Sequence, residues 1–298
     1  MKNINKEFKQ WLVTLGFADS SVKSLPQYIN EMLTWLEDNN ISEVNQITKE
    51  SIQYFFFQWK NRKNKTSGAG LSTHHINKGA LAINNFIKFL KATERLCIEL
   101  KLEREQVLPK TPQVLTQAEI KAIYAATYNN DRRINTAAFG QRDRAMLAVY
   151  YGCGLRRNEG YNLLTSDIQT DKKLIYVRKG KGNKERFVPI ADKGLQDIEE
   201  YLDYGRKFFL EHRQKRIKPK HEYFFINKHG APLAEFTARI RLLTDDARIN
   251  KKVSLHTFRH SIATHLLQSG MEIEQIKKFL GHASLESTQL YTHIVNEL

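Results

Sequence analysis

The sequence has few of the features that mark secreted or membrane proteins. Its 298 residues include only two cysteines, Cys97 and Cys153, which lie far apart and outside any CxxC spacing. A disulfide framework and a cysteine zinc site are therefore not indicated. No apolar run follows the N-terminal MKNINKEFKQ, and none reaches the length that crosses a bilayer. We therefore expect a cytoplasmic protein with no secretory signal and no membrane partner.

Acidic residues are scarce relative to basic ones. The chain has 32 Asp and Glu against 47 Lys and Arg, which gives a net charge of +15. On a soluble chain this charge favours a polyanion as partner, nucleic acid before membrane, although charge alone also fits a protein that is merely basic. Hydrophobic residues make up 41% of the chain, and its length allows one large domain or two ordinary ones.

Residues 1–107 show helical periodicity in four segments, which predicts a compact helical unit. We expect Ser20 and Ser21 to cap the second helix, so that Pro26 falls in its first turn. Thr48 and Ser72 are the expected caps of the third and fourth helices. Basic residues near the loop before the fourth helix are candidate DNA contacts, against the alternative of a generic bundle with solvated lysines; they are Lys63, Lys65, His74, His75 and Lys78.

Residues 108–114 carry two prolines and little hydrophobic periodicity, as an interdomain linker would. A helix is expected to start at Thr116, where TQAE has the form of a capping box. Two β-rich runs, 174–178 and 186–190, are joined by a glycine-containing turn and predict a hairpin. A further strand is expected over EYFFI, residues 222–226. The predicted fold class is mainly α with a small β-sheet (α+β).

The last quarter of the chain combines two short helices with side chains suited to phosphate chemistry. His256 and Arg259 are three residues apart on the first helix, so they share one side of it. A second helix is expected to end at Gly281. His282 follows that end directly, and Tyr291 comes nine residues later. Each of these residues alone has an ordinary structural explanation, but the combination is far more specific.

HTFRH, LGH and the following tyrosine resemble the C-terminal box of the tyrosine recombinases, the phage integrase and Xer-like family. Two upstream motifs also match, GLRRNE and GKGNKER followed by VP. The resemblance implies a catalytic set of Arg156, Lys181, His256, Arg259, His282 and Tyr291. Glu159 would support Arg156, while Lys184, the fallback for the lysine position, and Arg186 are further candidate DNA contacts.

The resemblance also implies roles for these residues. Arg156 and Arg259 would stabilise the phosphorane, because planar guanidinium groups match phosphoryl oxygens, and His282 would donate a further hydrogen bond. Tyr291 would be the nucleophile and His256 its base, and Lys181 would protonate the departing 5′-oxygen. Neither a cofactor nor a metal is expected.

The implied architecture is a helical, SAM-like core-binding domain over residues 1–107, the linker 108–114 and a catalytic domain over 115–298. Two departures stand out. Gly160 replaces an apolar residue that the family often has, and only seven residues follow Tyr291, so the usual exchange of a C-terminal helix between subunits is in question.

The implied function is site-specific recombination, in which DNA is cut and rejoined through a 3′-phosphotyrosyl intermediate. The partner would be double-stranded DNA with paired inverted arms, bound by a homotetramer across two sites, alone or with a second recombinase. Such an enzyme would act on the bacterial nucleoid, in replicon resolution or on a mobile or invertible element. The alternatives are a type IB topoisomerase-like enzyme that relaxes DNA and a catalytically silent DNA-binding accessory protein.

Overall fold

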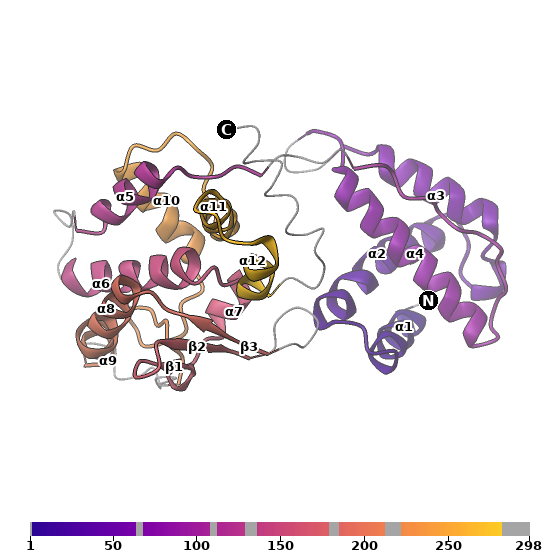
Figure 1. Ribbon diagram of the computed structural model, residues 1–298. Helices are drawn as coiled ribbons and strands as arrows, with labels where there is room; N and C mark the ends of the chain where they lie inside the picture. The colour runs from indigo at the N-terminus through magenta and orange to yellow at the C-terminus, as the bar shows by residue number, and fades with distance from the viewer. Residues whose placement is uncertain are drawn as a thin grey trace. The chain divides into compact units, whose positions relative to one another are not determined.

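The chain is divided into two compact units, Met1–Lys110 and Thr111–Leu298. They are seen here in a computed structural model, which describes residues 2–63, 68–107, 112–128, 136–178, 185–211 and 222–281 (Figure 1). The division falls inside the segment 108–114, and each unit encloses a hydrophobic core of its own.

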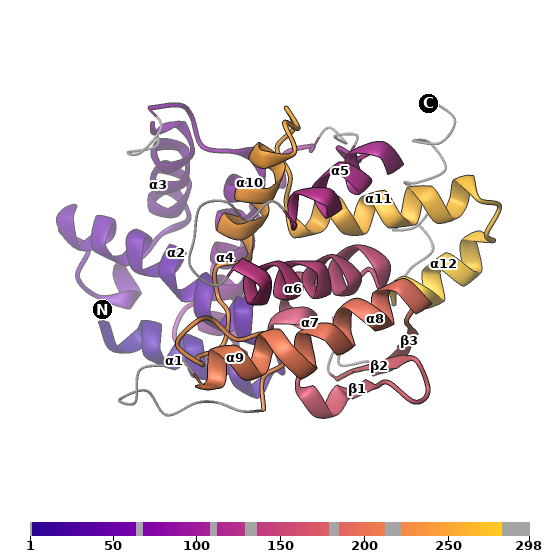
Figure 2. The same cartoon turned by 90° about the vertical axis from the view of Figure 1, so that its left-hand side faces the viewer.

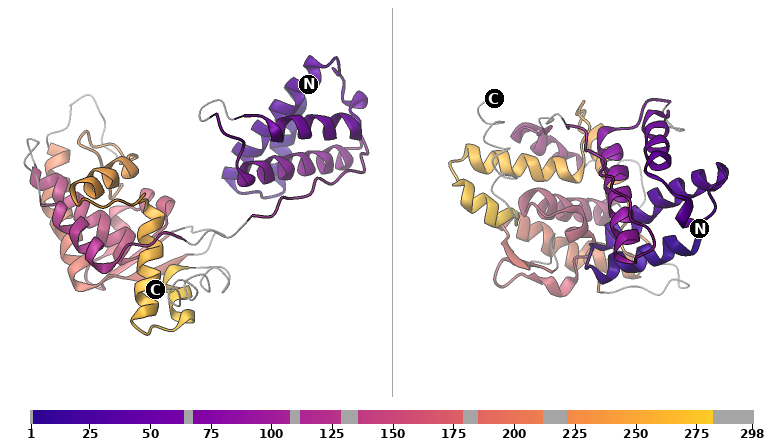
Figure 3. Two further views of the ribbon diagram at one scale, coloured as in Figure 1. Left: turned by 90° about the horizontal axis from the view of Figure 1, so that it is seen from above. Right: turned by 90° about the vertical axis from the view of Figure 1, so that its right-hand side faces the viewer.

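The N-terminal unit is helical. Its elements are α1 (Lys2–Thr14), α2 (Asp19–Asp38), the 3₁₀ turn η1 (Val44–Gln46), α3 (Lys49–Asn61) and α4 (Thr73–Ala92) (Figure 3). Apolar faces of these helices meet in a core where the Phe8 ring packs against Phe86 and Phe89. The helical segments predicted from periodicity are therefore confirmed.

The predicted caps of α3 and α4 are confirmed, whereas that of α2 is wrong. The hydroxyls of Thr48 and Ser72 each accept a hydrogen bond from a first-turn backbone N–H, at 3.2 and 3.3 Å. Helix α2 instead begins at Asp19, before the expected serines, and places a carboxylate in its first turn, where the helix dipole favours negative charge. Pro26 consequently lies inside the helix and not in its first turn.

The C-terminal unit combines helices with a small sheet. Its elements are α5 (Gln117–Ala126), α6 (Thr136–Leu147), the π-helix η2 (Ala148–Gly152), α7 (Arg157–Tyr161), η3 (Thr165–Asp167), β1 (Ile168–Gln169), β2 (Leu174–Val177), β3 (Arg186–Pro189), α8 (Asp192–Glu200), the π-helix η4 (Tyr201–Gly205), α9 (Arg206–Glu211), α10 (Phe236–Asp246), α11 (Leu255–Gln268) and α12 (Ile273–Leu280). The three strands are antiparallel in the order β1-β2-β3. No helix within the described ranges is long and apolar enough to cross a membrane.

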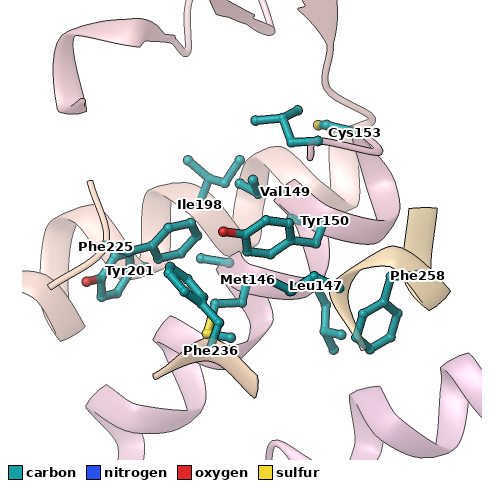
Figure 4. Close-up of a cluster of buried hydrophobic side chains, with 14 of the residues drawn as sticks. Met146, Leu147, Val149, Tyr150, Cys153, Ile198, Tyr201, Phe225, Phe236 and Phe258 are labelled. Atoms are coloured by element: carbon teal, nitrogen blue, oxygen red, sulfur yellow. The ribbon is translucent and has the colours of Figure 1, made fainter. Parts of the chain in front are cut away.

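The core of this unit is built around α6 and η2, which lie between α11 and α8 (Figure 2). Tyr150 on η2 is buried, and its ring stacks on Phe225 and meets the ring of Phe236 edge-on (Figure 4). One residue after η2 ends, the GLRRNE motif begins at Gly154. The position of Arg156 is therefore fixed by a packed, aromatic part of the core.

The structure confirms the hairpin and corrects the strand expected over residues 222–226. In place of a strand, this segment makes isolated bridges, Leu164 to Tyr223 and Ile226 to Pro232. The reason is that Phe224 and Phe225 are both fully buried, whereas a strand at a sheet surface would alternate between core and solvent. The mainly α fold with a small sheet is confirmed.

Candidate active site

Arg156 is held from two sides at the start of α7. Its backbone N–H and its Nη1 donate to the Glu159 carboxylate at 2.8 and 2.7 Å, and Nη2 donates to the carbonyl oxygen of Gly281 at 2.7 Å. The Glu159 side chain is almost fully buried, at 3% exposure, whereas that of Arg156 is 20% exposed. The guanidinium is therefore fixed in direction while one side remains accessible.

Arg259 lies on α11 and is buried. Its Nη1 donates to the carbonyl oxygen of Gly154, and its Nη2 donates to that of Leu280 at 2.6 Å. Both acceptors are backbone carbonyls of the first residue of a short motif, Gly154 of GLRRNE and Leu280 of LGH. The second arginine of the predicted set therefore connects these two motifs through the fold.

The two arginines converge on the end of α12. Arg259 binds the carbonyl of Leu280, and Arg156 binds that of Gly281, the next residue. Two glycines in the left-handed region allow this approach, Gly154 with φ 60° and Gly281 with φ 64°. A Cβ at Gly154 would lie 2.8 Å from the Leu280 side chain. The glycines of both motifs are thus needed for close packing as well as for chain reversal.

His256 lies in the first turn of α11 and is exposed, three residues before Arg259 on the same helix. Its pKa is lowered from the ordinary 6.5, first by partial desolvation and then by the positive charges of Arg259 and Arg156. The imidazole is therefore largely neutral at pH 7, which is the form that a general base requires.

His260, one turn along α11, is more deeply placed than His256. Its pKa is lowered to about 4, mainly by burial, and then by the neighbouring charges of His256 and Arg259. In the unfolded chain the imidazole returns to an ordinary pKa of 6.5. The unfolded state consequently binds more protons between these two values, and acid favours unfolding in that range.

We expect the free energy of unfolding of the C-terminal unit to fall as the pH drops from about 6.5 to about 4, by up to ~3 kcal/mol from His260 alone. The variant His260→Gln should lose this part of the pH dependence. Urea titrations followed by circular dichroism would measure it. All three tryptophans, Trp11, Trp35 and Trp59, lie in the N-terminal unit, so their fluorescence reports that unit separately.

The exposed His74, in the N-terminal unit, supplies the control variant His74→Gln. It should leave the pH dependence of the C-terminal unit as it is in the unaltered chain. An equally steep acid loss in His260→Gln would show that other groups cause it.

Gly160 makes room for Tyr150. A Cβ at this position would lie 2.5 Å from the Tyr150 hydroxyl oxygen and 2.6 Å from its ring. The large ring on η2 therefore fills the space that an apolar side chain at position 160 would take. At this departure from the family pattern, the Tyr150 ring therefore occupies the core volume that a side chain at position 160 would fill.

Arg186 was a candidate DNA contact, but its guanidinium is directed inward. Nη1 and Nη2 each donate to the Glu159 carboxylate at 2.9 Å, and the side chain is only 13% exposed. Sequence reasoning missed this arrangement. The alternation along β3 contained the signal, because Arg186 shares a strand face with the buried Val188.

The other candidates have different surroundings. Lys63, His74 and Lys78 are exposed in the N-terminal unit. His75 is half-buried there: its ring stacks on Trp59, and its Nδ1 shares a hydrogen bond with the Tyr28 hydroxyl at 3.1 Å. Five candidates, Lys65, Lys181, Lys184, His282 and Tyr291, lie outside the described residues.

The donor groups of the site are suited to an anion. Within the described ranges, no cluster of three or more His, Cys, Asp or Glu side chains could hold a metal ion. Two guanidinium groups at one helix end can instead bind and polarise a phosphodiester.

Comparisons with known proteins agree with this chemistry. A sequence model described as "Phage integrase family" matches residues 113–297. Tyrosine recombinase XerD of Halalkalibacterium halodurans is 30% identical over 99% of this chain and 95% of its own length. Tyrosine recombinase XerC 2 of Ralstonia nicotianae is 32% identical over 96% of this chain and 80% of its own.

Solved structures share the fold. The XerH site-specific recombinase bound to palindromic difH substrate, a post-cleavage complex, has a TM-score of 0.64 at 20% identity, over 93% of this chain and 76% of that one. The Tn1549 transposon integrase in complex with a circular intermediate DNA has a TM-score of 0.66 at 16% identity, over 97% of this chain and 94% of that one.

Proposed function

We propose, from the premise that this chain belongs to the phage integrase family and is a site-specific tyrosine recombinase, that Tyr291 cuts DNA within a site built on Arg156, Arg259 and the end of α12. One observation supports this most directly. The two guanidinium groups bind the consecutive carbonyls of Leu280 and Gly281, immediately before His282. Both guanidinium groups of the predicted set therefore lie at the end of α12, and His282 is the next residue in the sequence.

The first step is an attack by the Tyr291 phenolic oxygen on the scissile phosphorus. The phenol has an ordinary pKa of about 10 and gives up its proton as it attacks, with His256 as the acceptor. Charge accumulates on the phosphoryl oxygens in the transition state. Arg156 and Arg259 stabilise that charge, because their directions are already fixed and no reorganisation is needed.

In the same step, the bond from phosphorus to the 5′-oxygen breaks. Lys181 supplies the proton that the leaving oxygen takes, and the 3′ end stays attached to Tyr291 as a phosphotyrosyl ester. The 5′-hydroxyl of another strand then attacks this ester and gives its proton to Lys181, while the oxygen of Tyr291 leaves and takes back the proton held by His256. Each step exchanges one phosphate ester for another, so no external energy source is consumed.

Exchange between two sites requires paired duplexes, and we propose a symmetric homotetramer that holds them, alone or with a second recombinase. A net charge of +15 supports tight contact with the DNA backbone. The DNA substrate puts the site of action at the nucleoid, in the cytoplasm of a bacterial cell.

Mapping covalently trapped DNA tests this proposal. The full chain is incubated with a library of nicked duplexes, the mixture is denatured, and the attached DNA is sequenced while mass spectrometry identifies the modified residue. We expect 3′-phosphoryl attachment to Tyr291 at a recurring sequence. Attachment through a 5′ end, or to another residue, would contradict the proposal. Paired sites should then yield Holliday junctions, which a relaxing enzyme would not form.

A further inference from the structure

Arg186 is an inward-facing residue at the start of β3. It pairs across the sheet with Val177, which is buried, and its own side chain is 13% exposed. Both terminal nitrogens bind the Glu159 carboxylate at 2.9 Å, the bidentate geometry that a guanidinium offers and an ammonium does not. The residue is therefore oriented by one carboxylate inside the protein.

That carboxylate is shared with Arg156. Oε1 of Glu159 accepts from Nη1 of both arginines, at 2.7 Å from Arg156 and 2.9 Å from Arg186. Oε2 accepts from the Arg156 backbone N–H at 2.8 Å and from Nη2 of Arg186 at 2.9 Å. The carboxylate thus joins β3 to the start of α7.

Arg186 also lies against the end of α12. A Cβ at Gly281 would come within 2.8 Å of its Cδ and Nε atoms. Nε is buried and has no hydrogen-bond partner among the described residues. Arg186 therefore touches the backbone unit whose carbonyl binds Arg156 and which directly precedes His282.

We infer that Arg186 is a positioning residue for DNA cleavage: through Glu159 it orients Arg156, and it keeps the Glu159 carboxylate from cancelling the charge that Arg156 presents to the phosphate. This inference rests on the proposed function and deepens it. It replaces a DNA contact at Arg186 with a role inside the site.

The charges of Arg156, Glu159 and Arg186 explain why cleavage should depend on Arg186. One carboxylate lies between two guanidinium groups, so the three side chains together carry one net positive charge. Without Arg186, Glu159 would pair with Arg156 alone, and the pair would be neutral. If Arg186 and Glu159 were both removed, no carboxylate would neutralise the charge of Arg156, which would keep its hydrogen bond to the Gly281 carbonyl.

The ionisation of Glu159 agrees with this account. Burial alone would raise its pKa, but the hydrogen bond and charge of Arg186, followed by the hydrogen bonds from Arg156, lower the pKa to about 2. Arg186 lowers the pKa of Glu159 more than Arg156 does, so it is a main partner of this carboxylate.

Rates of covalent attachment and DNA affinities, measured on the duplex recovered by trapping, test the inference. Arg186→Gln should attach about 10- to 100-fold more slowly, the usual loss when a group that orients a site residue is removed. Its DNA affinity should change by less than about threefold, because backbone contacts elsewhere supply the binding energy.

The double variant Glu159→Gln with Arg186→Gln distinguishes this role from a purely structural one. It should attach faster than Arg186→Gln, by roughly tenfold, because it removes the carboxylate that neutralises Arg156. A purely structural role predicts that the double variant is no faster than the single one. That result would overturn the inference, as would an unchanged rate in Arg186→Gln.

Arg178→Gln is the matched control. Arg178 follows β2 of the same hairpin, and its Nε binds a different buried carboxylate, that of Asp167, at 2.5 Å. Its loss should leave the attachment rate within about threefold of the unaltered chain, since a partly exposed ion pair contributes little. A loss as large as that of Arg186→Gln would show a general effect of weakening the hairpin and would overturn the inference.

Thermal unfolding identifies any variant that fails to fold. If Arg186→Gln does not fold, Arg186→Lys takes its place, because it keeps the charge and loses only the bidentate fork. It should bind DNA normally and attach more slowly than the unaltered chain, and an equal rate would overturn the inference. If the unaltered chain itself forms no adduct, the proposed function fails, and that outcome is distinct from all of these.

Discussion

We expect Tyr291→Phe to abolish covalent attachment to DNA. The attachment rate should fall by roughly 10⁴-fold or more, as it does when the nucleophile of a covalent enzyme is removed. Phenylalanine keeps the ring and removes only the oxygen that would form the ester. DNA affinity should therefore stay within about twofold of the unaltered chain, because the contacts with the backbone are retained. Denaturing gels of a labelled, nicked duplex measure attachment, and native gels measure binding.

Tyr161→Phe provides a control for this variant. Tyr161 is the last residue of α7 and is exposed, so losing its hydroxyl should leave attachment unchanged. If Tyr291→Phe still became covalently linked, another residue would be the nucleophile. A joint loss of attachment and affinity would instead mean that Tyr291 contributes to binding.

Arg156→Lys should reduce the attachment rate by about 10²- to 10³-fold, the cost of removing one preoriented donor from an anionic transition state. Lysine keeps the charge but cannot reproduce the forked contacts with Glu159 and the Gly281 carbonyl. The ammonium group would therefore follow the carboxylate and turn away from the phosphate. Single-turnover rates at saturating protein separate this effect from a change in affinity.

Arg157→Lys is the matched control, because Arg157 is the next residue and is exposed. Its attachment rate should remain within about threefold of the unaltered chain, as is usual for a surface substitution. A near-normal rate for Arg156→Lys would show that the Arg156 guanidinium does not stabilise the transition state. A similar loss in both variants would point to a general dependence on positive charge.

Local sequence signals predicted much of the fold. Thr48 and Ser72 cap helices as expected, and Gly281 ends α12 in the left-handed conformation, because each of these features depends on a few neighbouring residues. The strand expected over residues 222–226 failed for the opposite reason. Phe224 and Phe225 are both buried in a core formed by distant segments, and no local pattern contains that information.

The candidate site shows the same distinction. The motif resemblance predicted roles for Arg156 and Arg259, but it did not reveal that backbone carbonyls of Gly154, Leu280 and Gly281 anchor them. Two of those contacts join residues more than a hundred positions apart, the third joins residues 21 positions apart, and all three exist only in the folded chain. Arg186 shows that a basic residue near a basic turn can still be an internal residue, since strand alternation takes precedence over local composition.

The carbonyl anchors at the end of α12 have an electrostatic consequence. A peptide oxygen is a dipole without a formal charge, and the C-terminal end of a helix carries roughly half a negative charge. Anchoring Arg259 on the oxygens of Gly154 and Leu280 therefore restrains its motion without neutralising it. A cation fixed in this way keeps more of its attraction for an incoming diester than it would beside a carboxylate, which carries a full negative charge.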